Sequence, residues 1–143
     1  MDDPGALAEL KILVDRANVS TTIKYEHLGC DLAQMLMIAA SDASFAGMPR
    51  GRSQGGCVVC LANPAIMQGT AKVAVLLWHS GLLKRVVRSS LAAEISQAAL
   101  AMEEGDFCRA LLAEMTQKTF SLNSWLPSVA MWQLVLVLDS RTG

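Results

Sequence analysis

One long helical stretch, residues 90–115, separates three β-prone runs from a fourth, and this order constrains the fold more than any other feature. The first three runs, residues 35–41, 56–62 and 72–78, have short connections, which favour an antiparallel meander. A helix of this length can carry the chain across the sheet. The fourth run, residues 134–138, is therefore predicted to lie beside the first and parallel to it. The expected fold class is α/β, with a mixed sheet and a long crossover helix.

The helical stretch has a start signal, an apolar stripe and one interruption. Ser89 or Ser90 can cap the first turn with a side-chain oxygen. Gly105 predicts a kink or a division of the helix, because glycine is conformationally permissive. The residues at helical spacing that we expect to face the sheet are Leu91, Ile95, Ala98 and Met102.

Composition indicates a globular protein without a membrane partner. The chain has 143 residues, of which 52% are hydrophobic and 17% charged, which is enough for one domain with a core. Its net charge of −1 gives no global basic signature for nucleic acid. No apolar run approaches about 18 residues, so no segment is expected to span a membrane. Four cysteines without a regular framework predict a reduced, intracellular protein, cytoplasmic or nuclear.

Three carboxylates lie in apolar surroundings. Asp42 follows the first apolar run, Glu94 lies in the helical stretch, and Asp139 ends the last run. A carboxylate at the tip of a core strand is costly unless something compensates its charge. The predicted topology brings Asp42 and Asp139 to corresponding ends of neighbouring strands, and Glu94 lies about 60° around the helix from Leu91, at the border of the stripe. Three converging carboxylates indicate a site for Mg²⁺ or Mn²⁺.

Each carboxylate also has an ordinary structural interpretation. Asp42 can cap a turn with its side chain, as aspartate often does. Glu94 can stabilise its helix, because a negative charge near the N-terminus interacts favourably with the positive end of the helix dipole. Asp139 can be the N-cap of a helix that follows the strand. Each carboxylate alone is a weak signal for a metal site. The three together, in the order strand end, helix and strand end, are a stronger one.

The words around the three carboxylates carry a family resemblance. They are SDASFAG at residues 41–47, RSSLAAE at 88–94 and VLVLDS at 135–140. Together with the basic segment WHSGLLKRVVRSS at residues 78–90, they resemble the RNase H domain of copia-type LTR retrotransposon Pol polyproteins. The resemblance implies an RNase H-like sheet, a three-stranded antiparallel meander with a parallel strand beside its first strand. It covers most of the chain.

The resemblance also implies a chemistry. Asp42, Glu94 and Asp139 would be the catalytic carboxylates that bind two Mg²⁺ or Mn²⁺ ions, and the reaction would be hydrolysis of RNA in an RNA–DNA hybrid. The reverse transcriptase of the same polyprotein would be a partner. Five basic residues are candidates for phosphate contacts, and a solvated basic face is the alternative for each: Arg50, Arg52, Lys84, Arg85 and Arg88.

The resemblance divides the chain and indicates a truncated copy. Residues 1–34, with an amphipathic helix expected over 4–17 and a β-prone segment over 21–28, are similar to the family's connection segment. Residues 35–143 resemble the RNase H-like domain, incomplete at its C-terminus, because the family pattern continues with a further strand, helices and a fourth metal-site residue.

Three hypotheses for the function follow. The chain is an RNase H-type ribonuclease domain, or a catalytically dead remnant that binds or supports other molecules, or an unrelated small α/β interaction domain. Whether it is an enzyme stays open at this point, with the resemblance favouring a hydrolase.

One further motif, Cys57-Val-Val-Cys60, has the spacing of a redox or zinc site. It falls inside a predicted strand, where residues three apart point to opposite faces and lie about 10 Å from each other. We therefore predict that both cysteines are structural.

Overall fold

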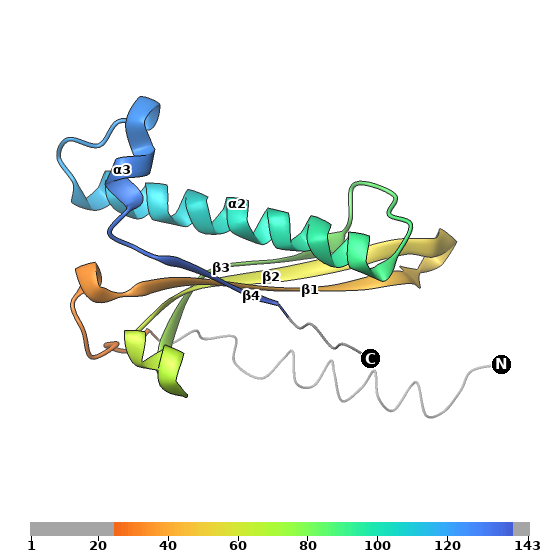
Figure 1. Cartoon of the computed structure of the whole chain (residues 1–143), viewed down its shortest axis with the longest axis horizontal. Helices are drawn as coiled ribbons and strands as arrows, with labels where there is room; N and C mark the ends of the chain where they lie inside the picture. The colour runs from red at the N-terminus through yellow and green to blue at the C-terminus, as the bar shows by residue number, and fades with distance from the viewer. Residues whose placement is uncertain (1–24, 139–143) are drawn as a thin grey trace.

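The computed structural model describes residues 25–138, and residues 1–24 and 139–143 lie outside this description. The described residues form a four-stranded sheet in the order β3-β2-β1-β4, with the long helix α2 across one face (Figure 1). The strands and α-helices are β1 (Leu36–Met48), β2 (Arg52–Ala62), β3 (Val73–Leu82), α2 (Ser90–Thr116), α3 (Trp125–Val129) and β4 (Leu134–Leu138).

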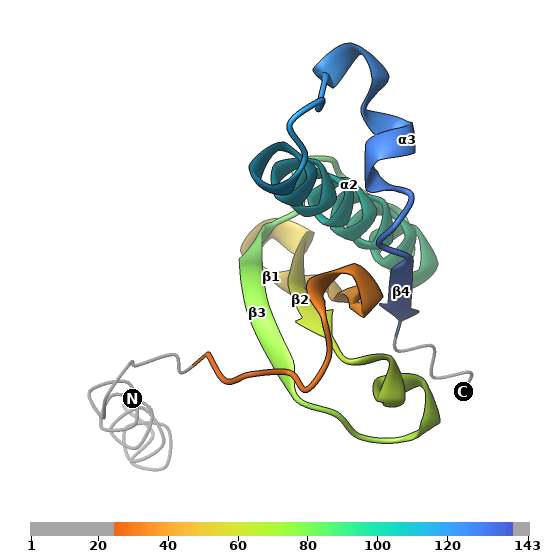
Figure 2. The ribbon, with the colours of Figure 1, turned by 90° about the vertical axis from the view of Figure 1, so that its left-hand side faces the viewer.

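The sheet is mixed, as the order of elements predicts. β1 and β3 each pair antiparallel with β2, and β4 pairs parallel with β1. Figure 2 shows β3 and β4 at opposite edges of the sheet, with α2 above it. The predicted mixed α/β class, the long helix and the single parallel pair are confirmed. No helix in residues 25–138 is long and apolar enough to cross a membrane.

β1 is longer than the apolar run that predicts it. The prediction that this strand ends before Asp42 is wrong, because Asp42 pairs with Gly56 and the ladder continues to Ser44 and Gln54. The chain turns from β1 to β2 at Pro49–Gly51, where Arg50 has a positive φ of 66°.

α2 is continuous across Gly105, and Ser89 caps it by accepting a hydrogen bond from the Ala92 amide at 3.1 Å. The helix is therefore not divided at Gly105, and Figure 1 shows no sharp bend along α2. The stripe prediction is also wrong except for Ala98, since Leu91 and Ile95 are 62% and 61% exposed. The residues of α2 that are buried are Ala93, Gln97, Ala98, Ala101, Gly105, Cys108 and Ala113.

The small size of these residues explains why they face the sheet. A Cβ built on Gly105 would lie 2.7 Å from Leu134 Cδ1 and 3.6 Å from the Cβ of Ala39. The helix backbone can therefore approach the sheet closely, and close packing decides which face is buried. Larger apolar residues on the neighbouring face are left exposed.

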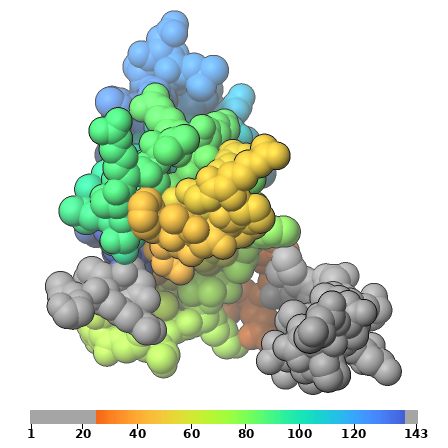
Figure 3. Space-filling view, turned by 90° about the vertical axis from the view of Figure 1, so that its right-hand side faces the viewer, coloured from red at the N-terminus to blue at the C-terminus, as the bar shows by residue number. Residues whose placement is uncertain are grey.

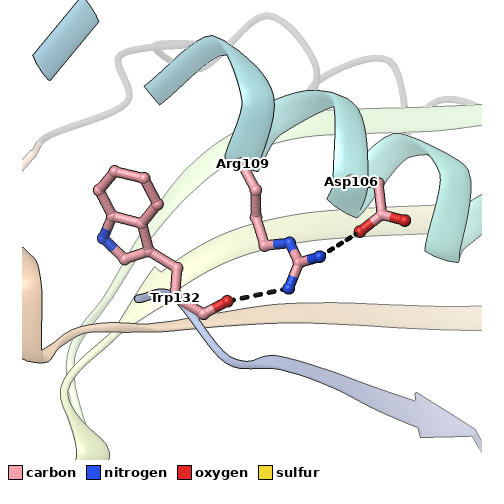
Figure 4. Close-up of polar contacts among 3 residues, drawn as sticks. All are labelled: Asp106, Arg109 and Trp132. Atoms are coloured by element: carbon pink, nitrogen blue, oxygen red, sulfur yellow. Dashed lines mark hydrogen bonds and ion pairs between the residues drawn. The ribbon is translucent and has the colours of Figure 1, made fainter. Parts of the chain in front are cut away.

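A second packed cluster joins the far end of α2 to the start of β4. Trp132 is 1% exposed, and its indole N–H donates to the carbonyl oxygen of Leu32 at 2.9 Å. Arg109 donates from one guanidinium nitrogen to the Trp132 carbonyl at 2.9 Å, and its other terminal nitrogen lies 2.7 Å from Asp106 Oδ1 (Figure 4). These contacts fix the point at which the chain enters β4.

The beginning of the described chain contains no strand. Residues 25–28, the described part of the β-prone segment, are irregular, so the strand prediction is wrong for them. Leu28 is nevertheless buried in the same core cluster as Met37 and Val59. The helix predicted over residues 4–17 lies outside the described residues.

Candidate functional site

Asp42 lies on the face of the sheet that α2 does not cover. Side chains alternate between the two faces of a strand, and Met37 and Ala39 of β1 are fully buried in the core cluster that includes Ala101 of α2. The even-numbered positions therefore face away from α2, and Asp42 is exposed there. Its side chain lines an open cavity of about 550 Å³ on this face.

Glu94 belongs to the opposite side of the sheet. It is half-buried in the first turns of α2, one turn before Gln97. A Cβ on Gly55 would collide with Gln97 Oε1, so Gln97 sits directly over β2. On a helix of 100° per residue, Glu94 falls within the same buried face. The Glu94 side chain is therefore on the α2 side of the sheet, and Asp42 is on the other.

The third predicted carboxylate, Asp139, lies outside the described residues. Leu138, the residue before it, is in register with Ser41, the residue before Asp42. Among residues 25–138, no three histidine, cysteine, aspartate or glutamate side chains form a group that could hold a metal ion. Carboxylate oxygens suit Mg²⁺, but Asp42 and Glu94 on opposite faces do not by themselves form such a site.

The five predicted phosphate-contact residues gather at one end of the molecule. Figure 3 looks onto this end, where the yellow β1–β2 hairpin lies next to the green segment that precedes α2. The Leu83 amide donates to the Ser53 carbonyl at 2.9 Å and ties the two segments together. The residues of this basic end are all exposed, and none forms an ion pair with a described residue: Arg50, Arg52, Lys84, Arg85 and Arg88.

The Cys57–Cys60 motif does not bring its two thiols together on one face. Cys57 belongs to the core cluster under α2, as do Val59 and Leu61, the two neighbours of Cys60. Cys60 therefore points to the other face, as predicted for a strand. Burial raises the pKa of both thiols, which disfavours the reactive thiolate.

Two polar features were missed by the sequence interpretation. Gln97 is 1% exposed, and its Nε2 has no hydrogen-bond partner among the described residues. Gln54 Nε2 donates to Ser80 Oγ at 3.2 Å on the face of the sheet that α2 does not cover, beside the cavity that Asp42 lines. Neither feature has a sequence signal, because residues 76–82 do not alternate between apolar and polar and nothing in a sequence marks a buried glutamine.

No protein-family model, curated protein or solved structure matches this chain. A function can therefore be proposed only from the short motifs around the three carboxylates and from the geometry of the described residues. That geometry offers a basic end suited to phosphates, a parallel β1–β4 pair, and carboxylates on both sides of the sheet.

Proposed function

We propose that the chain is an RNase H-like domain derived from a copia-type retrotransposon polyprotein and acts on RNA–DNA hybrids. The observation that carries the proposal is the parallel β1–β4 pair joined through the 27-residue helix α2. In that register Ser41 is beside Leu138, and these residues immediately precede Asp42 and Asp139 in the sequence. The five cations at the basic end support a ligand that carries phosphates.

Each group has a role in this proposal. Asp42, Glu94 and Asp139 would hold two Mg²⁺ or Mn²⁺ ions, which activate water and stabilise the leaving oxygen when bound. The basic end would position the phosphate backbone of the hybrid. The reverse transcriptase of the parent polyprotein is the proposed partner.

A second candidate function is binding of the hybrid without cleavage. The observation that favours it is the placement of Asp42 and Glu94 on opposite faces of the sheet. Two ions must be held close together against their mutual repulsion, and carboxylates on opposite faces serve this poorly. The chain would then be a remnant of an RNase H domain that keeps the basic end for binding phosphates and has lost the metal site.

Cleavage of a labelled RNA–DNA hybrid by the full chain separates the two candidates. We expect slow cleavage that requires Mg²⁺ or Mn²⁺ and falls to background in Asp42→Asn, which keeps the shape and removes the charge. Glu114→Gln, an exposed carboxylate near the other end of α2, should cleave like the unmodified chain. A hybrid that is bound but uncut with either metal would establish the second candidate, and cleavage that survives Asp42→Asn or a chelator would contradict the first.

A further inference from the structure

The face of the sheet that α2 does not cover presents an exposed tryptophan in a row of paired residues that crosses all four strands. Trp78 of β3 pairs with Val58 of β2, Val58 with Ala40 of β1, and Ala40 with Val137 of β4. Leu77, the residue before Trp78, packs in the core under α2. Trp78 therefore points away from α2, and it is 70% exposed. Figure 1 shows no described α-helix on this face.

The next row of the same face is polar and hollow. Ser80 pairs with Gly56, and Gly56 with Asp42. The cavity of about 550 Å³ opens here, and Gly56 in its lining has no side chain to fill it. Gln54 and Ser80, hydrogen-bonded to each other at 3.2 Å, also line the cavity. The row therefore offers hydrogen-bond donors and acceptors beside an aromatic ring.

The same face leads to positive charge at the basic end. Ser53 is 5% exposed, and alternation places Arg52 on the opposite side of β2, the side of Gln54. Lys84 follows Leu83, whose amide is bonded to the Ser53 carbonyl. β3 advances about 13 Å from Trp78 to its end at Leu82, and Lys84 lies in the segment that follows. An aromatic ring and a polar hollow thus lie along β2 and β3, and Arg52 and Lys84 lie at or just beyond the same end of these strands.

We propose that this face binds single-stranded RNA, with one base stacked on Trp78 and the phosphate backbone running toward Arg52 and Lys84. Aromatic side chains on a sheet provide stacking platforms for bases, and a neighbouring positive groove tracks the backbone. The polar hollow at Gly56 receives the edge of a base next to the stacked one, where Ser80 and Gln54 can exchange hydrogen bonds with it. A single strand suits this face because its unpaired bases can reach an exposed aromatic ring.

The inference deepens the proposed function, since it rests on a nucleic-acid ligand. It adds Trp78 and the hollow beside Asp42 to the surface already proposed for the hybrid, and it names a second form of the ligand. The RNA–DNA hybrid needs the basic end, whereas the single strand also needs Trp78. The two can therefore fail separately in one set of measurements.

The test is fluorescence anisotropy of a labelled single-stranded RNA and a labelled hybrid, each titrated with the full chain. Loss of one stacked base should weaken single-strand binding by Trp78→Ala about tenfold, which corresponds to about 1.4 kcal/mol. Trp78→Phe keeps a stacking ring and should stay within about threefold of the unmodified chain. Phe107→Ala, a matched aromatic that is 59% exposed on α2, should change nothing. RNA should also quench the tryptophan fluorescence of the unmodified chain.

Each outcome decides something. Equal single-strand affinity of Trp78→Ala and the unmodified chain overturns the inference, and so does an equal loss in Phe107→Ala. Hybrid binding without single-strand binding overturns it while the proposed function stands. Binding of neither ligand overturns both. A dimer that Trp78→Ala dissociates in sedimentation, without an effect on RNA, would show that a second copy of the chain covers this face.

Discussion

Replacing Trp132 by alanine is expected to lower the free energy of unfolding by about 3–5 kcal/mol, the cost of truncating a fully buried tryptophan. The ring is 1% exposed and packs in a cluster with Val129 and Ala113. Its indole N–H also bonds the carbonyl of Leu32, 100 positions away in the sequence. The change therefore leaves a cavity and a carbonyl without its donor, and it loosens the entry to β4.

Chemical denaturation followed by circular dichroism measures this loss, with Trp78→Ala as the matched control. Trp78 is 70% exposed, so its truncation should change the free energy of unfolding by less than about 0.5 kcal/mol. Similar losses for the two tryptophans would contradict the packing described for the far end of α2.

Replacing Gly105 by leucine should lower the free energy of unfolding by about 2–3 kcal/mol. At an exposed helical position the same change would be favourable, because leucine has the higher helix propensity by up to about 1 kcal/mol. At Gly105 even a Cβ would lie 2.7 Å from Leu134 Cδ1. A larger side chain must displace Leu134 and crowd Ala39, so a loss of stability at this position indicates that helix and sheet approach each other closely.

Glu103→Leu provides the control for Gly105→Leu. Glu103 is exposed on the same helix, so leucine there should leave the free energy of unfolding within about 0.5 kcal/mol of its original value. Thermal or chemical denaturation of the two variants measures the difference directly. A Gly105→Leu variant as stable as Glu103→Leu would show that α2 does not lie close to β4.

The order of elements and the limits of α2 could be predicted because their signals are local. Ser89 marks the start of α2. A long helix before residues 134–138 can carry the chain back across the sheet, which favours a parallel partner strand. The buried face of α2 could not be predicted from hydrophobicity. Gly105 and Ala101 face the sheet because they are small, and that choice depends on the distance between the helix and the strands.

One part of the candidate site could be predicted from the sequence and another part could not. The basic end was predictable because Arg50 and Arg52 flank a turn and Lys84 follows the strand that pairs beside it. The placement of Asp42 and Glu94 on opposite faces of the sheet was not predictable. Both the odd and the even positions of residues 35–41 are apolar, so the sequence does not tell which of them face the helix. A shift of one residue would move Asp42 to the other face of the sheet. The face of Asp42 follows only from the burial of its neighbours in the folded chain.

The measurement that tests the central claim most directly is the affinity of the full chain for an RNA–DNA hybrid as a function of salt. If the basic end binds phosphates, the logarithm of the affinity should fall linearly with the logarithm of the salt concentration. Each phosphate-contacting cation changed to glutamine should reduce that slope by about one. The residues to change, singly and together, are Arg50, Arg52, Lys84, Arg85 and Arg88.

Lys118→Gln, an exposed lysine beyond the other end of α2, is the matched control and should bind the hybrid like the unmodified chain. The account predicts a steep salt dependence for the unmodified chain and a flatter, weaker one for the variant that lacks all five cations. An affinity that does not depend on salt, or a five-cation variant that binds as tightly as the unmodified chain, would contradict it.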